Sequence, residues 1–334
     1  MSKKIALVGA AHVHTPGFVK AMIAKSDEVT VKYVYDHDAA RAEKYAGELS
    51  SETAELDTIL NDDEIESVVI CSETIHHEAL VSKCVDAGKN MFIEKPIGMG
   101  AEDSKAMAEK IGSSGLLFQT GYFMRSNPIH IFLKNEIAAG NFGTITRIRV
   151  SNCHGAALGG WFDTDYRWMA DPAISGCGAF GDLGTHVLDI MLWLRPTKPV
   201  SATGSIQLGT RTYEGCDEFG EGIIKFEDES IGIIAGAWVN VDNPVTLEIA
   251  GTEGHATVFK GKLYYKSEKR DGADGEEWTD LPDAIPRAFD IFLEHVTGDT
   301  THPLVPINEA ANVCITMDAI YKGASNNIWQ DIHI

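Results

Sequence analysis

The sequence predicts an α/β domain with a parallel sheet, followed by an α+β domain built on a large, mostly antiparallel open sheet. Up to about residue 121, short apolar runs alternate with helical runs, which is typical of parallel strands covered on both faces. Beyond that point longer strand-like runs follow one another with few helices between them, which favours antiparallel pairing. We therefore place one domain at 1–122 and the second at 123–334.

Turn and cap residues mark the elements of the first half. Pro16 suits the first turn of a helix, and Gly88 suits the position just after a helix end. The segments that we expect to be strands are 4–8, 29–35, 67–71, 90–93 and 116–119. The segments that we expect to be helices are 16–25, 38–49, 57–61, 76–87 and 101–113.

The second half is richer in strand patterns. Helices are expected at 128–139, 179–194, 284–297 and 308–324. Strands are expected at 145–153, 200–208, 221–226, 230–239, 245–249 and 256–259. The polar and glycine-containing segments 215–222 and 268–278 are expected to be surface loops.

Composition excludes several classes of function. The chain of 334 residues is 44% hydrophobic and 23% charged, as in ordinary globular proteins. A net charge of −21 argues against binding to nucleic acid or to an anionic membrane surface. No apolar run approaches the roughly 20 residues of a membrane span, and the apolar stretch near the start is too short for a signal peptide. The 6 cysteines form no CxxC pair, so we expect a reduced, cytoplasmic protein.

The turn after the first strand resembles an incomplete dinucleotide fingerprint. The G-x-G-x-x-G pattern keeps its first glycine as Gly9, whereas Ala11 and His14 occupy the places of the other two. Asp36 ends the second strand, where a carboxylate can accept hydrogen bonds from a ribose diol and repel a 2′-phosphate. The strand–turn–helix context therefore predicts NAD rather than NADP as cofactor. The alternative is that Asp36 only caps a turn or a helix.

His12 and His14 also permit a different hypothesis. Two histidines after a first strand occur in metal-dependent hydrolases built on eight-fold βα barrels, which need further histidines and an aspartate at other strand ends. The strand-rich second half cannot supply those units. We therefore expect hydrogen-bonded histidines in a tight turn, and no metal.

Glu94-Lys95-Pro96 directly follows the expected strand 90–93. This position puts a cation at the carboxyl edge of a parallel sheet, where α/β proteins bind ligands. Pro96 constrains the residue before it, and a bond between any residue and proline can be cis at modest cost. The alternative is a solvated lysine at a strand end.

A stripe of titratable residues lies on the expected helix 179–194. Asp182, His186 and Asp189 are spaced i, i+4 and i+7, which places them along one side of that helix. Glycines at the start of the helix allow a ligand to approach the backbone. The pattern indicates an acid–base site, with a satisfied histidine and two surface acids as the alternative.

Taken together, these motifs resemble those of the Gfo/Idh/MocA oxidoreductases, which include glucose–fructose oxidoreductase and inositol dehydrogenase. Glu94-Lys95-Pro96, the segment 121–128 and Asp182-x-Gly184-x-His186-x-x-Asp189 are similar to three family motifs in the same order. The resemblance covers about residues 3–325 and implies an N-terminal Rossmann domain that binds NAD. The nucleotide turn is the departure from the family pattern.

The resemblance implies reversible hydride transfer between nicotinamide and a carbinol of a sugar, inositol or related polyol. Lys95 is expected to polarise the carbinol oxygen, and Asp182 to orient or charge-balance the site. His186 is expected to be the general acid or base, because an unperturbed imidazole has a pKa of about 6.5. The predicted cofactor-binding residues are Gly9, Ala11, His12, Asp36, Ser72, Thr74, His77, Glu94 and Lys95.

Substrate contacts are expected from Tyr122, Arg125, Trp161 and Asp189, although Trp161 also suits an ordered loop anchored by aromatic residues. Two other functions stay open: an NAD-using glycoside hydrolase on the same scaffold, and a non-catalytic nucleotide-binding protein. The long strands of the second half permit a homodimer or homotetramer that forms through the C-terminal sheet.

Overall fold

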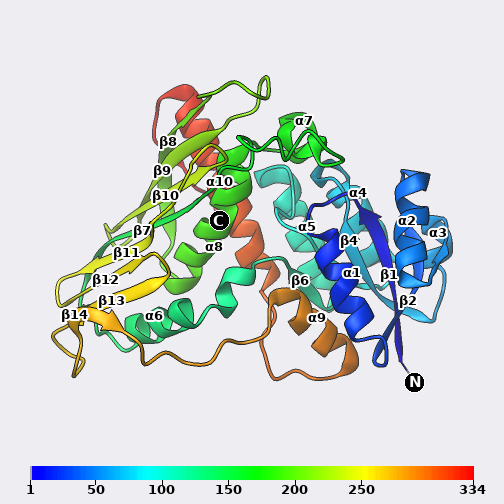
Figure 1. Cartoon of the computed structure of the whole chain (residues 1–334), viewed down its shortest axis with the longest axis horizontal. Helices are drawn as coiled ribbons and strands as arrows, with labels where there is room; N and C mark the ends of the chain where they lie inside the picture. Colours follow the sequence, from blue (N-terminus) through cyan, green and yellow to red (C-terminus); the bar gives the residue numbers. More distant parts are fainter. Residues whose placement is uncertain (1) are drawn as a thin grey trace.

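The structure is a computed structural model that describes residues 2–334. Two sheets stand apart with helices between and around them, and the chain ends beside the second sheet (Figure 1). The first sheet is parallel, with strand order β3-β2-β1-β4-β5-β6. The second sheet has 9 strands in the order β14-β13-β12-β11-β7-β10-β9-β8-β15. The predicted fold class is confirmed.

The parallel sheet is buried on both faces, as its apolar strands require. Ile5 and Leu7 pack with residues of α1, α2 and α9 on one face, whereas Ala6 and Val8 pack with residues of α3, α4 and α5 on the other. The strands are β1 (Lys3–Ala10), β2 (Val29–Tyr35), β3 (Glu52–Thr53), β4 (Ile65–Cys71), β5 (Asn90–Ile93) and β6 (Phe118–Thr120). The helices of this half are α1 (Thr15–Ala24), α2 (Ala39–Leu49), α3 (Leu56–Leu60), η1 (Thr74–His76), α4 (His77–Asp86) and α5 (Ala101–Ser114).

The second sheet is antiparallel except for the parallel pairing of β7 with β10. Its strands are β7 (Ile145–Cys153), β8 (Pro199–Gln207), β9 (Phe219–Phe226), β10 (Ile231–Ala237), β11 (Val245–Gly251), β12 (Gly254–Phe259), β13 (Lys262–Ser267), β14 (Asp274–Trp278) and β15 (Gln330–Asp331). The helices of this half are η2 (Phe123–Ser126), α6 (Pro128–Ala138), η3 (Arg167–Ala170), α7 (Pro172–Ser175), α8 (Ala179–Leu194), α9 (Ala288–Thr297) and α10 (Ile307–Asn326). Helices α8 and α10 cover the face that looks toward the first sheet (Figure 1).

Two expected loops are partly strands. Segment 268–278 was expected to be a loop, but β14 begins at Asp274 and pairs with β13, with Trp278 opposite Leu263. Its polar residues are poor strand formers, so pairing at the sheet edge rather than propensity fixes this strand. Segment 215–222 is also not a surface loop throughout, because Glu218 is fully buried and β9 begins at Phe219.

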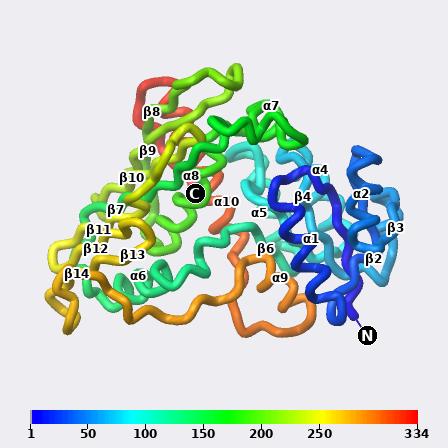
Figure 2. The backbone as a smooth tube through the Cα atoms, in the orientation of Figure 1, coloured from blue at the N-terminus to red at the C-terminus, as the bar shows by residue number. Residues whose placement is uncertain are grey.

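The boundary after residue 122 separates the two sheets but not the two cores. Phe289 and Phe292 of α9 pack against Phe92 of β5, with ring centroids 4.9 and 5.8 Å apart. The tube in Figure 2 shows α9 beside α1, although these helices lie at opposite ends of the sequence. A segment of the second half therefore covers one face of the first sheet.

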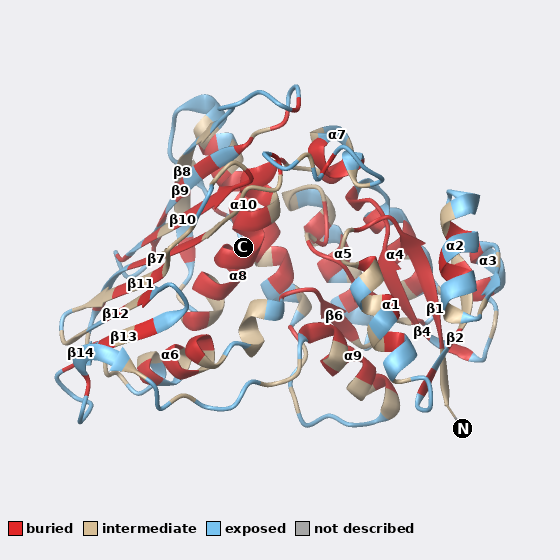
Figure 3. Ribbon diagram, viewed as in Figure 1, coloured by how far each residue is buried: buried red, intermediate tan, exposed pale blue. Residues whose placement is uncertain are grey.

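Burial follows this architecture: the strands of the first sheet and the inner sides of α8 and α10 are buried (Figure 3). In residues 2–334, no helix has the length and apolar character needed to cross a membrane. All 6 cysteines, which lie within this range, are free thiols.

Candidate active site

The predicted site residues of the first half lie along one edge of the parallel sheet. Gly9, Asp36, Ser72 and Glu94 occur at or directly after the ends of β1, β2, β4 and β5. Because these strands are parallel, their carboxyl ends meet at the same edge. Helix α8 of the second half reaches this edge, and its contact with Lys95 joins the two halves of the site.

Lys95 and Asp182 form a buried ion pair. The Nζ atom of Lys95 lies 2.7 Å from Oδ1 of Asp182, and the lysine side chain is only 2% exposed. The indole N–H of Trp238 donates to the other carboxylate oxygen at 3.1 Å. Burial opposes both charges, yet Asp182 raises the pKa of Lys95 and Lys95 lowers the pKa of Asp182. The Lys95-Pro96 peptide bond is cis.

A partly buried carboxylate holds the start of α8 in place. Asp217 accepts hydrogen bonds from the backbone N–H groups of Gly178 and Phe180, at 3.1 and 2.7 Å. Negative charge at a helix N-terminus is stabilising. At Gly236 of β10 a Cβ atom would lie only 2.9 Å from the carbonyl oxygen of Phe180. Glycine there allows α8 to approach the sheet closely, and this sets the position of Asp182.

His186 lies one helical turn beyond Asp182 and is also buried. Its ring makes an edge contact with Phe123, with centroids 4.9 Å apart. Its Nδ1 atom has no hydrogen-bond partner in the described part of the chain. Burial, followed by the nearby Lys95 and His14, lowers the pKa of His186 well below its ordinary value. The imidazole is therefore neutral at neutral pH.

Lys95, Asp182 and His186 line one cavity of about 200 Å³, here named the catalytic cavity. Its wall combines aromatic rings with a few polar groups, a composition that suits a small polyhydroxylated ligand. Trp161, a predicted substrate residue, is among the lining residues. The full set is Val13, His14, Lys95, Phe123, Asn152, His154, Trp161, Phe162, Tyr166, Met169, Asp182, Leu183, His186 and Trp238.

Three other predicted substrate residues lie outside this cavity. Tyr122 is buried, with its hydroxyl 3.4 Å from Oγ1 of Thr185. Arg125 makes a bidentate contact with Asp189, with nitrogen–oxygen distances of 2.5 to 3.1 Å. It also donates to Glu309 of α10 at 2.7 Å. The Arg125–Asp189 pair joins η2 to α8, so the structure gives both residues a structural position rather than a place in the catalytic cavity.

The nucleotide turn keeps the tight geometry that the fingerprint requires. Gly9 has a φ of +78°, and a Cβ atom there would lie 2.5 Å from Cβ of Ser72. Ala11 replaces the second fingerprint glycine; it is buried, and its carbonyl accepts a hydrogen bond from Nε1 of Trp168 at 3.1 Å. Helix η3 of the second half therefore contacts the turn. The strand–turn–helix frame and the acid after β2 fit a dinucleotide in kind and position.

Asp36 is already fully hydrogen-bonded. Its carboxylate accepts from the backbone N–H groups of Ala10 and Asp38 and from two nitrogens of Arg41, all within 2.9 Å. These bonds use the four acceptor positions of a carboxylate. Burial opposes the charge of Asp36, but Arg41 keeps its pKa below the ordinary value. A ribose diol can reach this carboxylate only when Arg41 releases it.

The other predicted cofactor residues lie near the same edge. Ser72, Thr74 and His77 are buried. The ring nitrogens of His77 lie 3.1 Å from the carbonyl of Ile97 and 3.3 Å from that of Ser72. Burial lowers the pKa of His77, and the neutral ring can donate to only one of these two carbonyls. Both ring nitrogens nevertheless face the protein backbone. Thr74 begins η1 at the end of β4, and its role as a cofactor contact remains a prediction.

His12, His14 and Glu94 form a compact group at the start of α1. Nδ1 of His14 lies 2.7 Å from Oε1 of Glu94, and Nδ1 of His12 accepts the backbone N–H of His14 at 3.2 Å. Potential ligand atoms of the three residues lie within 4.8 Å of one another. In this arrangement, however, the Nδ1 atoms bond to groups within the cluster. Both histidines are hydrogen-bonded in this turn, and Glu94 is an additional partner.

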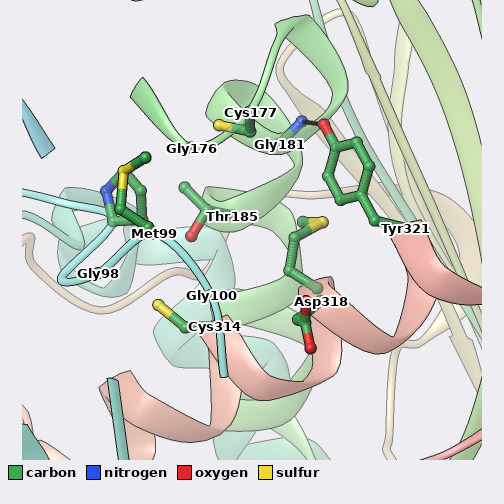
Figure 4. A pocket seen from close by; sticks show the side chains of 12 residues that line it. Gly98, Met99, Gly100, Gly176, Cys177, Gly181, Thr185, Cys314, Asp318 and Tyr321 are labelled. Atoms are coloured by element: carbon green, nitrogen blue, oxygen red, sulfur yellow. Dashed lines mark hydrogen bonds between the residues drawn. The ribbon is translucent and has the colours of Figure 1, made fainter. Parts of the chain in front are cut away.

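A second cavity, of about 190 Å³, lies behind the cis peptide, between the 96–100 loop, the start of α8 and α10. Figure 4 shows Cys177, Thr185 and Cys314 around it, and the hydroxyl of Tyr321 bonded to the N–H of Gly181 at 2.9 Å. None of the predicted catalytic or cofactor residues lines this cavity.

Sequence reasoning missed several residues that shape the site. Trp238 and His154 line the catalytic cavity. Asp217 holds the start of α8, and Arg41 donates to the carboxylate of Asp36. Asp217 lies in a segment expected to be a loop, and Trp238 lies near the end of the expected strand 230–239. Only Arg41 carried a local signal, because it lies five positions after Asp36 on the polar side of an expected helix.

Both halves of the chain match models of a known protein family. Residues 3–122 match the model of the oxidoreductase family with an NAD-binding Rossmann fold. Residues 130–257 match the GFO/IDH/MocA C-terminal domain. The levoglucosan dehydrogenase of Pseudarthrobacter phenanthrenivorans is 27% identical, and the alignment covers 88% of this chain and 86% of that one. The scyllo-inositol 2-dehydrogenase (NAD(+)) of Bacillus subtilis is 25% identical over 83% of this chain and 80% of its own.

A solved structure of a levoglucosan dehydrogenase in complex with NADH and levoglucosan has the same fold, with a TM-score of 0.83 at 20% identity over 100% of both chains. A NAD binding oxidoreductase from Klebsiella pneumoniae has a TM-score of 0.81 at 20% identity, again over 100% of both chains. The two domain models, the relatives and the Lys95–Asp182 pair agree, and the chain belongs to the Gfo/Idh/MocA family of NAD(P)-dependent oxidoreductases.

Proposed function

We propose that this protein is an NAD-dependent dehydrogenase that acts on a carbinol of a sugar, inositol or related polyol. The observation that carries the proposal is the buried Lys95–Asp182 pair, which lines an aromatic cavity beside His186 at the carboxyl edge of a dinucleotide-binding sheet. The similarity to dehydrogenases of levoglucosan and scyllo-inositol supports this class of substrate.

Each residue of the cavity has a role that follows from its chemistry. Lys95 is a cation held by Asp182, and it binds the carbinol oxygen, where negative charge develops as the hydroxyl proton leaves. Asp182 keeps Lys95 protonated and in place, and Trp238 fixes the carboxylate. When bound, the nicotinamide supplies the acceptor for the hydride. The aromatic wall, with Trp161 and Phe162, excludes water and packs against the polyol ring.

The sequence predicts that His186 is the general acid or base, and this role stays a prediction. Its pKa is lowered well below the ordinary value, first by burial. A low pKa makes the neutral imidazole a weak proton acceptor. The neutral ring is suited to accept a hydrogen bond from a substrate hydroxyl and so to orient it.

The charge around Arg41 supports NAD over NADP. The guanidinium of Arg41 donates to two carboxylates, those of Asp36 and of Glu73, the latter at 3.0 Å. One cation and two carboxylates leave a net negative charge on these three side chains, and a 2′-phosphate would be repelled. The residues that would hold the cofactor are Gly9, Ala11 and His12 of the turn, together with Asp36, Thr74 and Lys95.

We expect NADH to raise the melting temperature more than NADPH at equal concentration. A ligand at 100 times its Kd stabilises the fold by about 2.7 kcal/mol, and a thermal-shift titration measures this. Glu73→Gln removes one negative charge and should narrow the difference between the two nucleotides. Glu78→Gln, an exposed change on α4, is the matched control. Equal shifts in the wild type would contradict the NAD preference, and no shift with either nucleotide would contradict the cofactor proposal.

Trp238→Phe is expected to lower kcat by about 10- to 100-fold with little change in KM. It removes the N–H that donates to Asp182, and hydrogen bonds to charged groups contribute about 1.5–3 kcal/mol. Steady-state kinetics with an active polyol measures the effect, with Trp329→Phe at an exposed site as the control. A Trp238→Phe enzyme with wild-type kcat would show that Asp182 does not depend on this bond.

We also propose that a second copy of the chain binds to the outer face of the C-terminal sheet, as a homodimer or homotetramer. Strand β9 alternates buried and exposed residues, and Phe219, Ile223 and Ile231 are exposed on that face. Large apolar side chains gathered on one face are typical of interaction surfaces. Sedimentation would register such an assembly as a multiple of the 36.3 kDa chain. The free cysteines support a cytoplasmic location.

A further inference from the structure

We propose that His14, oriented by Glu94, is a catalytic residue that accepts the hydroxyl proton of the substrate. The inference rests on the proposed dehydrogenase function and gives the reaction a proton acceptor other than His186. It also explains the main departure from the dinucleotide fingerprint, because His14 occupies the place of the third glycine.

The geometry of the pair is that of an imidazole held by a carboxylate. Nδ1 of His14 lies 2.7 Å from Oε1 of Glu94, whose side chain is 0% exposed. With the ring proton on Nδ1, His14 donates this hydrogen bond to the carboxylate of Glu94, and Nε2 is left as an acceptor. Glu94 itself is fixed against the chain, since a Cβ atom at Gly121 would lie 2.5 Å from its Oε2. Glu94 is therefore a positioning residue for His14.

His14 lies where a substrate and the solvent can both reach it. It lines the catalytic cavity with Lys95 and Asp182. It also lines a neighbouring cavity of about 440 Å³ between α1 and α9. Its side chain is 38% exposed, whereas that of His12 is 4% exposed. A proton accepted by His14 can therefore pass to water without crossing the protein.

No other imidazole of the catalytic cavity is held by a carboxylate in the described chain. His186 is buried with an unpartnered Nδ1. Nδ1 of His154 accepts the backbone N–H of Ala156 at 3.2 Å, and burial lowers the pKa of His154. A carboxylate partner stabilises the imidazolium that forms on proton transfer, and of the three imidazoles that line the catalytic cavity only His14 has such a partner among the described residues.

The proton step balances with the hydride step. The O–H bond of the carbinol breaks and its proton bonds to Nε2 of His14, while the O–H electron pair forms the second bond of the carbonyl. The C–H bond breaks with both electrons, and a bound oxidised nicotinamide would supply the acceptor for this hydride. The charged groups near His14 are Glu94, Lys95 and Asp182, and Arg287 and Asp290 line the cavity between α1 and α9. His12 and His186 are neutral neighbours, because burial lowers the pKa of each well below its ordinary value.

The first test is kinetic. His14→Ala is expected to lower kcat by about 100-fold, because general base catalysis contributes 10²–10⁴-fold. The thermal shift with NADH should be retained, and added imidazole should restore part of kcat. Glu94→Gln should lower kcat without changing KM and should displace the acid limb of the pH profile. His255→Ala, at an exposed site on β12, is the matched control and should behave as wild type.

The second test does not depend on turnover. Long-range ¹H–¹⁵N spectra of the ligand-free protein should show His14 as the Nδ1–H tautomer, and Glu94→Gln should shift its ring resonances. An Nε2–H tautomer, or His14→Ala with kcat within about threefold of wild type, would overturn the proposal. So would activity lost with EDTA and restored by Zn²⁺, which would assign the cluster to a metal. If wild type reduces no nicotinamide with any polyol, the dehydrogenase proposal fails, and the tautomer still decides on the His14–Glu94 pair.

Discussion

Lys95→Met is expected to lower kcat by at least about 10²–10³-fold, the range measured when one donor that stabilises developing oxyanion charge is removed. It should also lower the free energy of unfolding by about 3–5 kcal/mol, because Asp182 would remain as a buried charge without its cation. Steady-state kinetics and urea denaturation measure the two effects on the same protein. The pair is suited to such a test because its two charged groups lie 2.7 Å apart, with side chains only 2% and 14% exposed.

A second substitution separates the two effects. In Lys95→Met with Asp182→Leu both charges are replaced by apolar groups, and such replacements in buried pairs are often neutral or stabilising. The double variant should recover most of the stability and none of the activity. A double variant that regains kcat would contradict a chemical role for Lys95.

The pair also makes stability depend on pH, and the sign follows from the two pKa shifts. The pKa of Asp182 is lowered in the folded state, so its contribution is present above the unfolded pKa and is lost as the pH falls through the folded value. The pKa of Lys95 is raised, so its contribution is present below its unfolded pKa and is lost as the pH rises through the folded value. The ion pair therefore stabilises the fold across the neutral range.

Arg125→Ala is expected to lower the free energy of unfolding by about 3–5 kcal/mol and to leave the KM for the polyol unchanged. Arg125 neutralises Asp189, which is 1% exposed, and also bonds to α10 through Glu309. Burial raises the pKa of Asp189 even with the arginine present. The decrease in the free energy of unfolding caused by Arg125→Ala should therefore be largest at neutral pH. It should become smaller as the pH falls and Asp189 takes up a proton. Urea denaturation at several pH values measures it.

The matched control is Arg125→Met with Asp189→Leu, which removes both charges and should restore most of the stability. Its kcat and KM should equal those of wild type. A raised KM in this folded double variant would show that Arg125 and Asp189 contact the substrate, as the sequence alone predicts.

The fold was predictable because its signals are local and repeated. Apolar runs alternating with helical segments predict the parallel sheet, and they also predict that strand-end residues such as Asp36 and Lys95 share one edge. Strand β14 was not predictable in the same way. Its residues 274–277 are Asp, Gly, Glu and Glu, and only pairing with β13 makes them a strand.

The site was predictable in part for the same reason. The stripe on α8 places Asp182 and His186 together, but helical spacing does not show where along a stripe a cavity ends. Asp189 lies beyond that point and is neutralised by Arg125. The contact of Trp238 with Asp182 joins residues 56 positions apart through tertiary packing alone. Nor does a strand-end motif show that its glutamate will hold a histidine of another loop, as Glu94 holds His14.

Direct hydride transfer is the central claim, and an isotope measurement tests it without knowledge of the natural substrate. An inositol or anhydrosugar with deuterium on its carbinol carbons would be incubated with the enzyme and NAD, and the nucleotide analysed by mass spectrometry. We predict one deuterium on the reduced nicotinamide of wild type and none with Lys95→Met/Asp182→Leu. Product formed without net reduced nucleotide, or reduced nucleotide without deuterium, would contradict the account.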